Sequence, residues 1–176
     1  MSNWSSGYNI DVGYTYGFYP ELAPNWLNAS AILNGVKPPV GKNLRYLELG
    51  CGFGLGLVLL AAMFPDYEFF GVDFNPVHIA HVQKLADDAG LTNIRFEEVG
   101  FVELAKYWPA EWGRFNYVAA HGIYTWLAAP VRQALGKTIE HATKPGALVY
   151  LSYNTMPGWA STLPLQHLLR YWQNTE

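Results

Sequence analysis

The 176-residue chain carries little charge and a single cysteine, and each shortage excludes a class of protein. Its 11 Lys and Arg against 14 Asp and Glu give a formal net charge of −3 without a basic run, which argues against a broad nucleic-acid interface. Cys51 alone allows no internal disulfide or multi-cysteine zinc site, and this fits a reducing compartment. No apolar run approaches the length of a membrane span, so we expect a soluble, cytoplasmic protein.

Apolar residues are abundant, at 51% of the chain with 16% aromatic, enough for one domain with a substantial core. The most informative stretch is residues 44–63, LRYLELGCGFGLGLVLLAAM. Residues 44–49 predict a buried strand, and residues 57–63 predict a helix that ends before Pro65. Four glycines alternate between them, at Gly50, Gly52, Gly54 and Gly56. A strand, a glycine turn and a helix together predict a nucleotide-binding corner.

The spacing of these glycines distinguishes between cofactors. A tight turn that aims N–H groups at a ligand needs backbone angles that side chains disfavour, and the following helix start attracts anionic groups. The dinucleotide fingerprint GxGxxG does not fit, because Leu55 or Leu57 would stand at its third glycine. The pattern from Glu48 to Gly54, E-x-G-x-G-x-G, resembles motif I of the class I S-adenosylmethionine-dependent methyltransferases. A glycine turn without a ligand is the alternative.

The second predicted strand also ends in an acidic residue, and this supports the prediction of a cofactor site. Residues 67–73 predict the second strand, and Asp73 falls about twenty residues beyond the glycine turn, where a carboxylate can accept hydrogen bonds from ribose hydroxyls. A helix over residues 76–89 follows. His78 and His81 are three apart on this helix, but no third ligand stands at a plausible spacing. We therefore assign no metal and expect both histidines to be solvated.

The next strand ends carry the other candidate site residues. Residues 92–99 predict the third strand, followed by Gly100 and Phe101. Methyltransferases of this class commonly carry an adenine-binding aspartate at the position of Gly100, so the resemblance implies that backbone groups and Phe101 hold the adenine here. Residues 115–120 predict the fourth strand. Because ligands of open parallel sheets lie beyond the carboxyl ends of the strands, the following loop, residues 121–126, is the candidate catalytic segment.

Outside these strands the pattern predicts several further elements. They are helices over residues 24–33, 130–143 and 161–172, a turn at Lys144-Pro145-Gly146, and a fifth strand over residues 147–153. In the last helix, Leu165, Leu168 and Leu169 are spaced for a buried face.

The first 40 residues, the aromatic N-terminal segment and its helix, differ in composition from residues 41–176, the predicted core. Trp4, Tyr8, Tyr14, Tyr16, Phe18 and Tyr19 stand among glycines. A disordered tail would be poor in aromatic residues, so we expect this segment to fold over the cofactor as a lid. Packing against the edge of the sheet is the alternative.

Four segments carry a narrower resemblance: YLELGCGFG, GVDFNP, AHGIYTW and YLSYNTMPGW. From about residue 14 to 170 the chain is similar to the catalytic domain of bacterial methyltransferases with a C-terminal regulatory domain, a group that includes lysine methyltransferases acting on outer-membrane proteins. The resemblance implies an α/β fold, a Rossmann-like doubly wound sheet of strand order 3-2-1-4-5 without the last two of the usual seven strands. An uncovered fifth strand would be an exposed edge, so we expect a fragment of a longer protein or self-association through that edge.

The resemblance also implies a cofactor, S-adenosylmethionine, and an amine acceptor on a protein or a small molecule. The cofactor residues are Tyr16, Tyr19, Glu48, Gly50, Gly52, Gly54, Asp73, Phe74, Gly100, Phe101 and His121, with Phe18 nearby. The acceptor residues are His121, Tyr124, Tyr153 and Asn154. We expect Glu48 to meet the amino end of the cofactor, the two tyrosines to orient the amine, and His121 or water to take its proton. For the tyrosines, packing alone is the alternative.

Two other functions remain open from the sequence. A catalytically silent domain that only binds S-adenosylmethionine would keep the same cofactor residues. A nicotinamide oxidoreductase fits less well, because the glycine spacing differs and the residues four beyond Tyr124 and Tyr153 are Ala128 and Pro157 rather than lysine.

Overall fold

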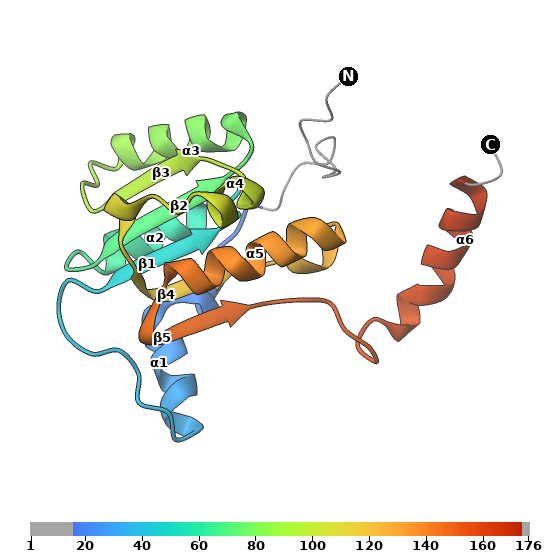
Figure 1. Cartoon of the computed structure of the whole chain (residues 1–176), viewed down its shortest axis with the longest axis horizontal. Coiled ribbons are helices and arrows are strands. Elements are labelled where there is room, and N and C mark those ends of the chain that lie inside the picture. Colours follow the sequence, from blue (N-terminus) through green and yellow to red (C-terminus); the bar gives the residue numbers. More distant parts are fainter. Residues whose placement is uncertain (1–15, 174–176) are drawn as a thin grey trace.

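The computed structural model describes residues 16–173, so the part of the predicted lid before Tyr16 lies outside the described residues. A five-stranded sheet forms the centre, with the order β3-β2-β1-β4-β5 (Figure 1). Its strands are β1 (Arg45–Leu49), β2 (Glu68–Asp73), β3 (Ile94–Glu98), β4 (Phe115–Ala120) and β5 (Thr143–Leu151). All neighbouring strands are parallel. The predicted Rossmann-like sheet and its strand order are confirmed.

Capping residues and prolines in the sequence mark where helices begin. They are α1 (Pro24–Leu33), α2 (Leu55–Met63), α3 (Pro76–Asp88), α4 (Phe101–Lys106), α5 (Ala129–Ala142) and α6 (Leu163–Gln173), with short 3-10 helices η1 (Pro20–Leu22), η2 (Ala110–Trp112), η3 (Tyr124–Trp126) and η4 (Ala160–Thr162). At the start of α3, the Asn75 side chain accepts a hydrogen bond from the Val77 N–H, and Pro76 occupies the first turn. The helix of residues 101–106 has no counterpart in the sequence prediction.

Each face of the sheet buries its own apolar cluster. Along β1, Tyr46 joins the cluster beneath η1, α1, α2 and α3, while Leu47 joins the one beneath α4 and α5. This alternation follows from the two-residue period of a strand. Tyr46 and Leu47 are both fully buried, so neither face of the central strand meets solvent. No helix among residues 16–173 is long and apolar enough to cross a membrane.

Two local predictions are wrong. The turn expected at residues 144–146 lies inside β5, because the strand already pairs with β4 at Thr143 and resumes at Leu148. The pairing advances from Phe115 to Tyr117 along β4 and from Thr143 to Leu148 along β5, so the extra residues form a bulge in which Gly146 has a φ of 79°.

The last helix is the second correction. Leu165 and Leu168 are 59% and 63% exposed, although their spacing predicted a buried face. Figure 1 shows α6 standing away from the sheet beyond an extended connection. Helical spacing creates an apolar stripe, but burial also requires a neighbouring surface.

Candidate functional site

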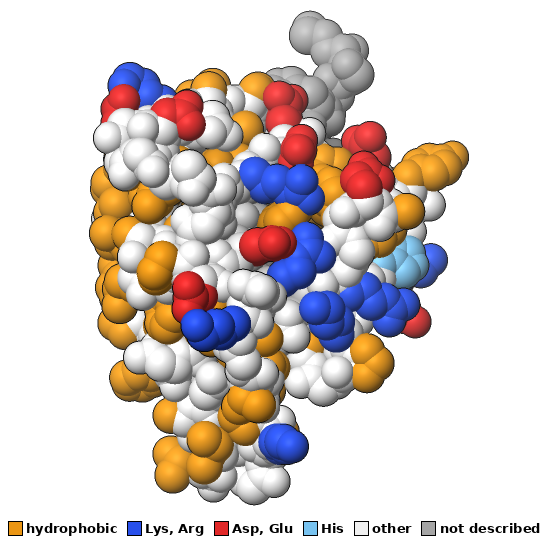
Figure 2. All heavy atoms as spheres, turned by 90° about the vertical axis from the view of Figure 1, so that its left-hand side faces the viewer, with side chains coloured by type: hydrophobic (Ala, Val, Ile, Leu, Met, Phe, Trp, Pro, Cys, Tyr) orange, Lys and Arg blue, Asp and Glu red, His pale blue; other side chains and the backbone are white. Residues whose placement is uncertain are grey.

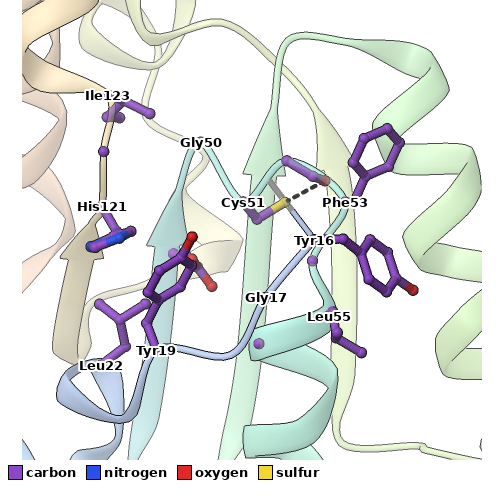
Figure 3. Close-up of a pocket in the computed structure, with 15 residues that line it drawn as sticks. Tyr16, Gly17, Tyr19, Leu22, Gly50, Cys51, Phe53, Leu55, His121 and Ile123 are labelled. Atoms are coloured by element: carbon purple, nitrogen blue, oxygen red, sulfur yellow. Dashed lines mark hydrogen bonds between the residues drawn. The ribbon is translucent and has the colours of Figure 1, made fainter. Parts of the chain in front are cut away.

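A cavity of about 210 Å³ lies at the carboxyl ends of β1 and β4, where the strand order reverses. This is the position at which open α/β sheets bind ligands. Three segments form its walls: the glycine turn after β1, the chain around η1, and the loop after β4 (Figure 3). The lining residues are Tyr16, Gly17, Tyr19, Leu22, Glu48, Gly50, Cys51, Gly52, Phe53, Gly54, Leu55, Gly56, His121, Gly122 and Ile123.

Hydrogen bonds fix the glycine turn to the end of β2. The N–H groups of Gly50 and Cys51 donate to the Val72 carbonyl at 2.8 and 3.0 Å. The Gly52 N–H donates to Oδ2 of Asp73 at 2.9 Å. The turn is therefore held in place before any ligand arrives, which lowers the ordering cost of binding.

The end of the turn leaves no room for a side chain. Gly54 has a φ of 63°, and a Cβ added there would lie 2.2 Å from Cγ2 of Val82 on α3. This close approach lets α2 begin at Leu55, at the cavity wall. The N-terminal end of a helix favours negatively charged groups.

Asp73 lies behind the glycine turn and is only 6% exposed. Its Oδ1 accepts a hydrogen bond from the Asn75 N–H at 2.9 Å and lies 3.3 Å from Nδ1 of His78. The His78 ring is buried and lies 4.7 Å from that of Phe53 between centroids. The expectation of a solvated histidine pair is thus wrong for His78, because its ring is buried in contact with Asp73 and Phe53. His81 is exposed.

Glu48 brings a buried carboxyl group to the cavity. It is 9% exposed at the end of β1. Burial, and secondarily the charge of Asp73, raise the pKa of Glu48 from 4.5 to about 8. The side chain is therefore mainly protonated at pH 7, and a cation placed beside it would favour its ionised form.

His121 begins the loop after β4, the strand that pairs with β1. Its ring stacks on Tyr19 with centroids 4.3 Å apart, as Figure 3 shows. Burial lowers the pKa of His121, and the charge of Glu21 partly opposes this effect. The imidazole is thus neutral at pH 7 and able to accept a proton.

The other predicted acceptor residues follow β4 and β5 at the same edge of the sheet. Tyr124 and Tyr153 have ring centroids 6.0 Å apart. Tyr153 is 58% exposed, and the Asn154 N–H donates to Oγ1 of Thr125 at 2.8 Å. These three side chains do not line the cavity.

The structure therefore divides the predicted site residues into two groups. The cavity gathers Tyr16, Tyr19, Glu48, Gly50, Gly52, Gly54 and His121. Outside its wall lie Phe18, Asp73, Phe74, Gly100, Phe101, Tyr124, Tyr153 and Asn154. Phe101 is nevertheless near, because a Cβ on Gly50 would lie 3.7 Å from its ring, and Gly100 precedes the first residue of α4.

Sequence reasoning missed several wall residues. Phe53 and Ile123 lie in segments already identified, so their neighbours could have indicated them, whereas Leu22 is brought to the cavity only by folding. Cys51 is buried, and burial raises the pKa of its thiol well above the usual value. This agrees with a structural thiol. Among residues 16–173, no three His, Cys, Asp or Glu side chains gather to hold a metal ion.

A doubly wound sheet with a pre-formed glycine turn and a cavity at its switch point defines a Rossmann-like cofactor-binding domain. Residues 47–146 match the methyltransferase domain family, and the chain belongs to that family.

Individual relatives extend the match over nearly the whole chain. An uncharacterized protein of Synechocystis is 42% identical over 174 residues, which cover 98% of this chain and 34% of the relative. The structure of PKMT2 from Rickettsia typhi in complex with AdoHcy superimposes with a TM-score of 0.80 at 25% identity, covering 92% of this chain and 30% of that one. A tRNA (guanine-N(7)-)-methyltransferase of Halorhodospira halophila is 36% identical over 63 residues, 36% of this chain and 27% of the relative. The chain thus spans about a third of the length of the first two.

Proposed function

We propose that the cavity binds S-adenosylmethionine and that the domain transfers its methyl group to an amine, foremost a lysine side chain of a protein. The observation that carries the proposal is the pre-formed glycine turn between Glu48 and Asp73, which faces a neutral His121 across the cavity. Family membership and the AdoHcy complex of PKMT2 support the same cofactor.

The residues present fit this cofactor chemically. Glu48 is the acidic side chain in the cavity wall, and the cationic amino group of the cofactor would favour its ionised form. Asp73 accepts a hydrogen bond from the Gly52 N–H of the glycine turn, and a ribose bound beside that turn would lie near its carboxylate. Because residue 100 is glycine rather than aspartate, the backbone at that position and the ring of Phe101 would hold the adenine. When bound, the cofactor supplies a methyl group on a positively charged sulfur.

The chain's own contribution to transfer is positioning and proton acceptance. The acceptor nitrogen must be uncharged to attack, so Tyr124 and Tyr153 would orient a neutral amine. Transfer would form an N–C bond, break the C–S bond of the bound cofactor and leave the acceptor nitrogen cationic. His121, or a water beside it, then takes the surplus proton; the lowered pKa of His121 leaves its ring unprotonated at pH 7 and so free to accept one.

Two observations favour a protein lysine over a nucleic acid. The segments around Tyr124 and Tyr153 resemble bacterial lysine methyltransferases, and the similarity to PKMT2 covers 92% of the chain. In addition, a net charge of −3 does not favour binding to a phosphate backbone, and Figure 2 shows Lys and Arg side chains interspersed with Asp and Glu side chains on one face.

The test begins with calorimetric titration of the chain with S-adenosylmethionine and S-adenosylhomocysteine, with NAD as a control. We expect both sulfur compounds to bind, Asp73→Ala to abolish binding, and Asp66→Ala, a change at an exposed residue before β2, to keep it. A radiolabelled-methyl assay on protein and peptide acceptors follows. Binding of NAD instead would contradict the cofactor, while cofactor binding without transfer to any amine would indicate the silent binding domain.

A further inference from the structure

The end of β5 holds the loop that carries His121. Beyond the last ladder pairs, the Ser152 N–H donates to the Ala120 carbonyl at 3.1 Å. In addition, Oγ of Ser152 accepts a hydrogen bond from the Gly122 N–H at 2.7 Å. The backbone is therefore tied to β5 on both sides of His121, which fixes where its side chain starts.

The imidazole itself lies against two tyrosine rings. Tyr19 covers it at 4.3 Å between centroids with planes inclined by 39°, and Tyr150 lies at 5.9 Å with planes inclined by 28°. Tyr150 also brings its hydroxyl oxygen to 3.5 Å from Nδ1 of His121. Catalytic hydrogen bonds are often long in the absence of ligand and shorten in the complex.

We propose that Tyr150 is a positioning residue for His121: its hydroxyl oxygen accepts the Nδ1–H, so that Nε2 is the nitrogen left free to accept a proton. This inference rests on the proposed function and adds Tyr150 and Ser152 to it. Neither residue touches the cofactor cavity, so each acts through His121 and its loop.

The direction of this hydrogen bond decides what His121 can do. In the neutral ring one nitrogen carries the proton and the other is the base. If the Tyr150 hydroxyl donated to Nδ1, Nε2 would carry the proton and could not receive another. Tyr150 is only partly buried, so water can take the phenolic proton while the phenolic oxygen accepts from His121.

The same arrangement suits the state after methyl transfer. When the amine loses its surplus proton to Nε2, both ring nitrogens carry protons, and the Nδ1–H still donates to Tyr150. The charged ring is also favoured by Glu21, the acidic residue whose charge acts on both His121 and Tyr150, whereas burial opposes it. Tyr150 therefore orients the ring without changing its own protonation.

Nuclear magnetic resonance tests this directly. In protein with 15N-labelled histidine, long-range 1H–15N spectra report which nitrogen of each of the 5 histidines carries the proton. The His121→Gln variant assigns the signal. We expect the Nδ1–H form at His121 in the native protein and a shift toward the Nε2–H form in Tyr150→Phe. Tyr107→Phe, a change at a residue that is 77% exposed, should leave the signal unaltered.

A dominant Nε2–H form in the native protein, or an unaltered His121 signal in Tyr150→Phe, would overturn the inference. Ser152→Ala provides a second variant if Tyr150→Phe fails to fold, and it should broaden or shift the same signal. With an acceptor in hand, Tyr150→Phe should lower kcat about tenfold or more with little change in the KM for S-adenosylmethionine. Because the spectra need no methyl transfer, they can support the hydrogen bond even where the proposed function fails.

Discussion

Replacing Glu48 with glutamine should remove a large pH dependence from the stability of this protein. The pKa of Glu48 rises from 4.5 to about 8 on folding, because burial and the charge of Asp73 both disfavour the carboxylate. At about 1.36 kcal/mol per pKa unit, this difference corresponds to roughly 5 kcal/mol of unfolding free energy. Glutamine has nearly the same shape and does not ionise, so the variant isolates the charge.

The sign follows from where the proton binds more tightly. The folded state holds the Glu48 proton up to about pH 8, whereas the unfolded state releases it near pH 4.5. The contribution of Glu48 is therefore fully present below pH 4.5 and is lost progressively as the pH rises toward 8. Glu48→Gln should gain stability relative to the native protein over that interval and stay level above it.

Urea unfolding at pH 5, 7 and 9 measures the effect. The difference in unfolding free energy between Glu48→Gln and native protein should grow by a few kcal/mol from pH 5 to pH 9. Glu97→Gln, a change at an exposed residue of β3, is the control and should show no such trend. A difference between Glu48→Gln and native protein that is independent of pH would refute the assignment of a protonated Glu48.

Ionisation of Glu48 should also be measurable when the cofactor binds. If the cationic amino group of S-adenosylmethionine lies beside Glu48, binding at pH 7 should release up to one proton, because the ionised carboxylate becomes the favoured form. Calorimetry in buffers of different ionisation enthalpy measures this release, and Glu48→Gln should abolish it. Proton release that persists in the variant would place the ionising group elsewhere.

Two further changes test the framework of the site. Gly54→Ala should lower the free energy of unfolding, measured in urea, by about 2 to 5 kcal/mol, because the new Cβ would collide with Val82 at a positive φ. Gly52→Ala meets open space and should lower it by about 1 kcal/mol. Equal losses in the two variants would contradict the packing argument. Tyr46→Phe should lower the free energy of unfolding by about 1 to 3 kcal/mol and speed hydrogen exchange in η1, because the Tyr46 hydroxyl donates to the buried Leu22 carbonyl at 3.0 Å. Unchanged exchange in η1 would show that this hydrogen bond does not hold the cavity wall.

Most elements of the fold could be predicted from local signals in the sequence. Apolar runs that end at glycine or an acid predicted β1 and β2, and Pro76 marked the start of α3. The errors occurred where a distant partner decides the structure. Residues 144–146 look like a turn, yet pairing with β4 on both sides keeps them in β5 as a bulge. Leu165 and Leu168 have helical spacing, yet burial would need a surface against them.

The sequence by itself determined the glycine turn, the acid that ends β2 and the loop after β4, because each is a property of a few consecutive residues. Only the tertiary structure decided how they act together. The stacking of Tyr19 on His121, the contact of Tyr150 with the same ring and the raised pKa of Glu48 all join residues far apart in the chain. Such contacts and burial depend on how the sheet brings its strand ends to one edge, which no local pattern encodes.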